Sequence, residues 1–216
     1  MATDETIKRI LDAAGPIFAD KGFREAHVRD ICEAAGVGLA SVNYHFGDKN
    51  QLYVRVVEAA FEYVIQNEPT PTWPPGTPLT ERMRTCIHDL ARRTLRPKDE
   101  SWQERLLTRE IHAPTPGCEG VIHKHINEHL QPLTALLNEV LPADLPDIER
   151  WRYVLTITGQ ILHYDSHRDV IAVIIGEAAD GPAFSAEALA EHITRFTLAA
   201  LGLAPTLGQQ TGSDPS

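Results

Sequence analysis

The chain has 216 residues, of which 43% are hydrophobic and 23% are charged, and its formal net charge is −10. This composition is typical of a globular protein and excludes collagen-like, disordered and disulfide-stapled classes for most of the chain. The apolar runs are far shorter than the roughly 20 residues that span a bilayer. The N-terminal MATDETIKRI has no apolar signal-peptide core, and the three cysteines form no CxxC pair. We therefore expect a cytoplasmic protein without a membrane segment.

The acidic charge is concentrated in the second part of the chain. Residues 1–56 carry seven basic and eight acidic side chains, whereas residues 57–216 carry 13 basic and 22 acidic ones. Nucleic-acid binders usually present a basic surface. Because the first part is neutral rather than basic, charge alone gives no support for DNA binding.

Helical spacing of apolar residues predicts four helices in the first part of the chain. They cover residues 4–21, 27–34, 37–46 and 48–66. Gly22 supplies a C-terminal stop for the first helix, with Phe23 as an apolar contact beyond it. Gly36 ends the second helix, and Asp48 is suited to cap the fourth.

A proline-rich stretch marks the clearest boundary, since five prolines fall within residues 68–78. Beyond it the pattern predicts helices at 79–95, 100–112, 117–141, 147–164, 166–175 and 185–202. No strand-like alternation occurs, so the predicted fold is all-α. We expect a three-helix helix-turn-helix domain at 1–47, a connecting helix at 48–66, a linker at 67–78, a second helical domain at 79–203 and a disordered tail at 204–216.

Residues 26–46 form a helix-turn-helix pattern with a tight turn, AAGV, at 34–37. Val28, Ile31, Val37 and Val42 would form the small core between its two helices. Such a unit can place its second helix in the major groove of DNA. Short helical hairpins are common, however, so the pattern alone leaves ordinary helical packing open.

The stretch from Ile7 to Val57 resembles the N-terminal DNA-binding domain of the TetR/AcrR family of transcriptional regulators. The matching segments are ILDAAGPIFADKGF (10–23), VRDICEAAGV (28–37) and GLASVNYHFGDKNQL (38–52). Asn43 and Leu39 depart from the residues that the family most often has at these positions. RLLTREIHAPTPG (105–117) and TGQILHYDSHRDVI (158–171) are more loosely similar to the C-terminal domain of CecR-type regulators.

The resemblance implies a repressor that binds a palindromic operator as a homodimer and is released by a small-molecule effector, with no cofactor. Arg29 and Lys49 are suited to phosphate contacts. Asn43 can pair with adenine. The full set of expected DNA contacts is His27, Arg29, Leu39, Ala40, Ser41, Asn43, Tyr44, His45 and Lys49. For Tyr44 packing against the first helix is the alternative, and for His27 a solvated surface position.

In the second domain the sequence suggests an effector pocket and a dimer interface. The expected effector contacts are Trp102, Leu106, Arg109, Glu110, His112, Tyr153, Ile157 and Tyr164. Arg109 and Glu110 could instead form an ordinary interhelical ion pair. The apolar stripe of the last helix predicts a dimer interface of Ile161, Leu189, His192, Ile193, Phe196 and Ala200.

Other chemistry finds less support. No catalytic motif such as GxSxG, a P-loop or HExxH is present, so no catalytic residue is assigned and the chain is not expected to be an enzyme. His125 and His129 have a spacing compatible with metal ligation, yet no convergent set of three is evident, so no metal ligand is assigned. Cys86 and Cys118 leave oxidant sensing open. The rival hypotheses are a metal- or redox-sensing regulator of the same fold, or a helical protein-interaction module that does not bind DNA.

Overall fold

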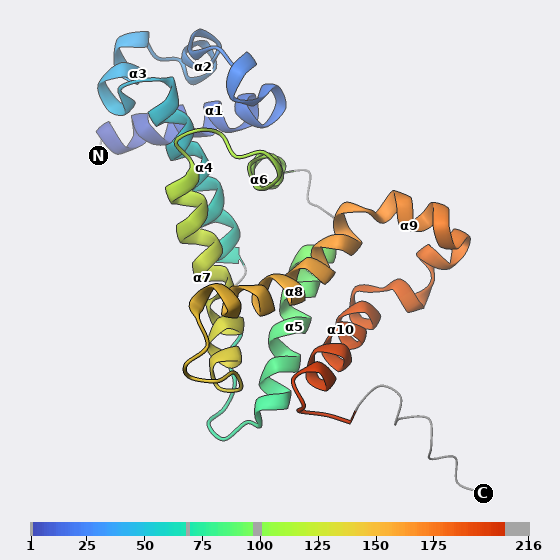
Figure 1. Cartoon of the computed structure of the whole chain (residues 1–216). Coiled ribbons are helices and arrows are strands. Elements are labelled where there is room, and N and C mark those ends of the chain that lie inside the picture. The colour runs from blue at the N-terminus through green and yellow to red at the C-terminus, as the bar shows by residue number, and fades with distance from the viewer. Residues whose placement is uncertain (1, 68–69, 97–100, 206–216) are drawn as a thin grey trace, which may run out of the picture. The chain divides into compact units, whose positions relative to one another are not determined.

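The regular structure of the chain is helical wherever it is described. The computed structural model describes residues 2–67, 70–96 and 101–205, and these ranges contain no strand (Figure 1). The all-α prediction is therefore confirmed. Most of the tail predicted at 204–216 lies outside the described residues.

The chain divides into two compact units. Unit 1 comprises residues 1–69 and 98–128, and unit 2 comprises residues 70–97 and 129–216. This division differs from the one expected from the linker, because residues 98–128 belong to unit 1 rather than to a second domain at 79–203. The physical reason is apolar burial: Leu106, Leu107 and Cys118 are buried in the core of unit 1.

Unit 1 is built from four N-terminal helices and the segment that returns to them. Its helices are α1 (Ala2–Glu25), α2 (Val28–Ala35), α3 (Leu39–Phe46), α4 (Lys49–Asn67), α6 (Trp102–His112) and the first half of α7 (Glu119–Asn138). α6 packs against both α1 and α4. At the α1–α6 contact a Cβ on Gly15 would lie 2.5 Å from Cε2 of Trp102, so only glycine allows this approach. In the core, Phe18 and Tyr53 meet edge to face with ring centroids 4.8 Å apart.

The first helix changes direction at the position that the sequence predicts. Gly22 adopts φ 73° and ψ 174°, a backbone conformation that strains residues with a Cβ. The ring of Phe23 then lies 5.1 Å from that of Tyr53. The stop signal at Gly22 and the apolar role of Phe23 are thus both realised.

Unit 2 has a helical core and a peripheral segment. Its main helices are α5 (Leu79–Leu95), the second half of α7, α8 (Asp147–Ser166) and α10 (Ala186–Ala200), and α5 packs against both α8 and α10. Between α8 and α10 the chain forms α9 (Arg168–Ile175) and two 3-10 turns, η1 (Gly176–Asp180) and η2 (Pro182–Phe184). These three short elements bury none of their side chains. None of the described helices is long and apolar enough to cross a membrane.

Candidate DNA-binding interface

The turn between α2 and α3 has the geometry of a helix-turn-helix. Gly36 adopts the left-handed conformation, φ 64° and ψ 38°, and its N–H donates to the carbonyls of Cys32 and Glu33. The N–H of Val37 donates to the carbonyl of Cys32 at 3.0 Å. This bonding ends α2 and starts α3 within three residues.

α3 has a buried and an exposed face. Val42 and Phe46 are buried and anchor it to the core, while Ser41 and His45 are half-buried. The exposed side chains, spaced so that they share one face, are Leu39, Ala40, Asn43 and Tyr44. Tyr44 is 83% exposed, so the alternative of packing against α1 does not hold for it, whereas Phe46 does pack inward. The exposed face combines a carboxamide, a phenol and small apolar groups, which suits contacts to base edges and methyl groups.

The remaining predicted DNA contacts lie around this helix. His27 is the residue that precedes α2, and both His27 and Arg29 are exposed. Lys49, at the start of α4, is more constrained: its Nζ donates to the carbonyl of Arg24 at 3.1 Å and lies 4.8 Å from the centroid of the Phe23 ring. Lys49 therefore also holds the end of α1 against α4. Asp48 caps α4 as predicted, accepting from the N–H of Gln51 at 2.8 Å.

Sequence reasoning missed one further contact at this site. Lys21 donates to Asp30 at 2.7 Å and ties the end of α1 to α2. The hydrogen bond from Lys21 is the main reason that the pKa of Asp30 lies below its ordinary value. No local signal could have revealed this pair, since the two residues lie on different helices.

Five predicted effector contacts lie on α6, in unit 1. Leu106 is fully buried in the core, and Trp102 lies over Gly15. Glu110, also fully buried, accepts from the Tyr53 hydroxyl at 2.6 Å and from the N–H of Thr115 at 2.9 Å. Desolvation and the hydrogen bond to Glu110 raise the pKa of Tyr53.

Arg109 and Glu110 serve different contacts. A Cβ on Gly22 would overlap Nη1 of Arg109, so this guanidinium lies over the turn at the end of α1. Glu110 instead faces Tyr53, and no ion pair joins the two side chains in the described part of the chain. His112 is exposed and interacts with the carbonyl of Thr108 at 2.7 Å.

The other three predicted effector contacts lie on α8, in unit 2. Ile157 is buried among the helices of that unit and Tyr153 is 41% exposed. Tyr164 is half-buried at the wall of a cavity, with its ring 6.3 Å from that of Phe184. Of the three, only Tyr164 lines a cavity of unit 2 large enough for a small molecule.

The six residues expected in a dimer interface separate into two groups. Ile161, Leu189 and Ile193 are buried within the chain itself, where α5, α8 and α10 pack together. Leu189 and Ile193 are buried because one side of the apolar stripe of α10 packs inside the chain and only the other side faces solvent. Ile161 on α8 is buried in the same core. His192, Phe196 and Ala200 are exposed, and Phe196 is 44% exposed.

The histidines and cysteines that invited a sensor hypothesis occupy packed positions. His125 stacks on Phe61 with ring centroids 4.7 Å apart. Burial raises the pKa values of the Cys86 and Cys118 thiols to about 12, which disfavours the reactive thiolate. Among the described residues no group of three or more histidine, cysteine or acidic side chains could hold a metal ion.

Two family models match the chain. The model described as bacterial regulatory proteins, tetR family, matches residues 10–56, which include α2 and α3. The model described as the C-terminal domain of the HTH-type transcriptional dual regulator CecR matches residues 79–201. The second match covers more than half of the chain.

The curated relatives match about a quarter of the chain. The biofilm operon icaADBC HTH-type negative transcriptional regulator IcaR of Staphylococcus epidermidis is 33% identical over 57 residues, which is 26% of this chain and 31% of that protein. IcaR of Staphylococcus aureus strain Newman is 32% identical over 56 residues, or 26% of this chain and 30% of that protein. The chain thus spans about a third of the length of these relatives.

Solved structures share the fold over nearly the whole chain. A transcriptional regulator from Rhodococcus sp. Rha1 aligns with a TM-score of 0.59 at 18% identity, covering 92% of this chain and 99% of that one. Salmonella enterica GusR aligns with a TM-score of 0.55 at 20% identity, covering 92% and 94%. The exposed face of α3, the two family models and this shared fold agree. The chain belongs to the family of the CecR C-terminal domain, which its residues 79–201 match, and its residues 10–56 match the model of bacterial regulatory proteins, tetR family.

Proposed function

We propose that the chain is a repressor that binds a palindromic operator as a homodimer, and that a small molecule bound in its C-terminal part releases the DNA. The observation that carries the proposal is the face of α3 formed by Leu39, Ala40, Asn43 and Tyr44. These side chains are exposed on a helix whose opposite face is anchored by Val42 and Phe46. A rigid helix with a solvent-facing polar surface is what major-groove reading requires.

Repression is supported by the likeness to IcaR, a negative transcriptional regulator that is 33% identical to this chain over 57 residues. A dimer is supported by apolar side chains left in solvent on α8 and α10. Leu155, Leu162 and Phe196 are 60%, 45% and 44% exposed in the single chain. Two-fold pairing also doubles the number of bases that one short recognition helix can read.

The test begins with selection of bound DNA from a random library by the full chain. We expect an inverted repeat, with affinity that falls steeply as salt rises. Failure to enrich any sequence, together with salt-independent behaviour on random DNA, would contradict the proposal and favour a protein-interaction module.

Two variants then separate base reading from backbone contact. Asn43→Ala should weaken operator binding by about 1–3 kcal/mol and leave scrambled DNA nearly unaffected, since it removes a bidentate base contact. Arg29→Ala should weaken both DNAs alike and lower the salt slope by about one unit. Arg29 is the better phosphate variant because Lys49 also holds Arg24 and Phe23. Equal losses on both DNAs for Asn43→Ala would show that Asn43 does not read sequence.

A further inference from the structure

Two cavities of unit 2 are large enough for a small organic molecule. One, of about 380 Å³, lies between α5 and α10, and the other, of about 360 Å³, lies where α8, α9, η1, η2 and α10 meet. We call the second the α9 cavity. Small-molecule sites typically begin at about 300 Å³. A third hollow of about 20 Å³ beside His129 is too small.

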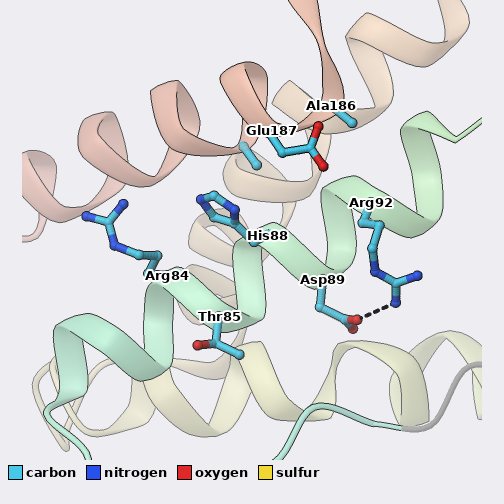
Figure 2. A pocket seen from close by; sticks show the side chains of 8 residues that line it. Arg84, Thr85, His88, Asp89, Arg92, Ala186 and Glu187 are labelled. Carbon is cyan, nitrogen blue, oxygen red and sulfur yellow. Dashed lines mark hydrogen bonds and ion pairs between the residues drawn. The ribbon is translucent and has the colours of Figure 1, made fainter.

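The cavity between α5 and α10 has charges that already satisfy one another. Figure 2 shows Arg92 directed at Asp89, and the two are bonded at 2.8 Å. Arg84 is paired with Glu191, and Nε2 of His88 lies 3.4 Å from the same carboxylate. A ligand there would have to displace these ion pairs, so this cavity is the weaker candidate.

The α9 cavity has the composition of a ligand site. Its walls are mainly apolar and include Leu95, Ile171, Phe184 and Leu189, with the ring of Tyr164 set edge to face against Phe184. The apolar part of these walls can accept a flat apolar group, and the polar side chains beside it can orient that group.

The segment that covers the cavity lacks a core of its own. α9, η1 and η2 together bury no side chain, although α9 is one of the most apolar helices of the chain. Ile171 and Ala172 are only half-buried at the cavity wall. A bound apolar group would complete the burial of these side chains. The apolar surface area that it removes from water would stabilise the bound state.

The charges at the cavity select the polar end of the ligand. Nη2 of Arg168 donates to the carbonyl of Leu95 at 3.2 Å, which holds the guanidinium beside a buried wall residue. Asp180 also lines the cavity, and both Asp180 and Arg168 are exposed. They differ in that the hydrogen bond to Leu95 holds Arg168 at the cavity wall. The anchored polar group is therefore a cation whose remaining N–H groups can bind a carboxylate.

We propose that the α9 cavity is the effector site and that it takes a compact aromatic carboxylate, with the rings against Tyr164 and Phe184 and the carboxylate on Arg168. The proposal deepens the proposed function and rests on it for the consequence: occupation of this cavity lowers operator affinity. Of the residues expected from sequence to contact the effector, only Tyr164 takes part.

The test uses three matched probes on the DNA-free full chain: naphthalene-1-carboxylate, naphthalene-1-methanol and 1-naphthylmethylamine. Calorimetry should rank the carboxylate first and the amine last. Arg168→Gln should weaken the carboxylate about ten-fold or more and leave the alcohol unchanged, while Arg168→Lys restores most of the loss. Asp180→Asn should tighten the carboxylate slightly. No binding of the carboxylate, or preference for the amine, would overturn the proposal.

Blocking variants locate the site. Ala172→Phe fills the cavity from α9, where no buried residue is disturbed, and should abolish carboxylate binding. Ala183→Phe, on the exposed part of η2 outside the cavity, and Arg92→Gln, in the other cavity, should bind as the unchanged chain does. Circular dichroism confirms that each variant is folded. If the Ala172→Phe variant still binds the carboxylate, the ligand binds outside the α9 cavity and the proposal is wrong.

The final arm measures operator affinity with and without the carboxylate. Wild-type chain should lose operator affinity on adding it, and Ala172→Phe should bind operator normally but not respond. Binding in the cavity without any change in operator affinity would overturn its role as effector site. Absence of operator binding by the ligand-free wild type would instead refute the proposed function, while the calorimetry still reports on the cavity.

Discussion

Unit 1 has one contiguous core drawn from α1–α4, α6 and the start of α7, and it exposes large apolar side chains on α3 and near the ends of α4 and α6. In unit 2, α8 and α9 expose seven large apolar side chains. The large apolar side chains exposed on these two helices are at least 41% accessible: Ile148, Tyr153, Leu155, Leu162, Val170, Val173 and Ile174. For α3 to hold its exposed face rigidly, its opposite face must be fully packed. Surfaces that bind a second copy or a ligand must stay open in the single chain. The difference in burial therefore fits the proposed roles of the two units.

The sharpest way to break this comparison is to truncate a phenylalanine in each unit. Phe18 is fully buried in unit 1, so Phe18→Ala should cost about 4 kcal/mol of unfolding free energy. Phe196 is 44% exposed, so Phe196→Ala should cost well under half as much at concentrations where the chain is monomeric. Urea denaturation of both variants measures the two costs. Equal losses would show that the two units are packed alike.

The second test asks whether the exposed stripe of α10 is an interface. Phe196→Glu should weaken dimerisation by about 3 kcal/mol or more, because it would bury an unpaired charge at the seam. Val173→Glu, at an apolar position on α9 that is 86% exposed, is the control and should leave the dimer intact. Sedimentation equilibrium measures the dimer dissociation constant of both variants. Dissociation by Val173→Glu with an unchanged Phe196→Glu dimer would move the interface to α9.

A smaller effect distinguishes packing from ligand binding on α6. Glu110→Gln should cost about 2 kcal/mol, because an amide cannot accept from both Tyr53 and Thr115 without directing its own N–H groups at a donor. Glu33→Gln, exposed on α2, is the control and should be neutral. Thermal unfolding and operator release are measured together. A Glu110→Gln variant of normal stability that no longer responds to the effector would restore the interpretation made from sequence.

The smallest effects should be shared by both units, and they concern acid pH. Hydrogen bonds from Lys21 to Asp30 and from Arg82 to Glu139 lower the pKa values of these carboxyl groups below their ordinary 3.8 and 4.5. A lowered folded-state pKa stabilises the protein above the unfolded value, and this contribution is lost as pH falls through the folded value. Asp30→Asn and Glu139→Gln should each flatten the decline of stability with acid below about pH 4.5. NMR titration of the carboxyl carbons checks the two shifts directly, and a raised value for either would contradict the prediction.

Much of the secondary structure could be predicted because its signals are local. The predicted helix at 79–95 coincides with α5, and that at 185–202 exceeds α10 by one residue at its start and two at its end. Gly22, Gly36 and the capping Asp48 mark ends that depend on backbone conformation and on hydrogen bonds within a few residues. The helix predicted at 37–46 corresponds to α3 for the same reason, since the motif is contiguous.

The assignment of helices to units was decided by tertiary structure. Leu106 and Glu110 on α6 are an apolar and an acidic residue in a helical pattern, which fits a ligand pocket as well as a core. Only the position of Tyr53, 57 residues away from Glu110, makes the core the observed environment. Pairings over such distances depend on which surfaces meet, and the linear pattern carries no record of that.

By itself, the sequence determined that the chain is all-α and where most helices begin and end. It also determined that residues 26–46 form a helix-turn-helix within a stretch, residues 7–57, that resembles the TetR family. Periodicity, capping and a contiguous motif are properties of neighbouring residues. Tertiary structure alone decided which side of α10 is buried, that α6 belongs with α1 and α4, and that α9 with its two short turns encloses a cavity. These outcomes depend on the packing of side chains from distant segments, where the free energy comes from area buried jointly and not from any one segment's composition.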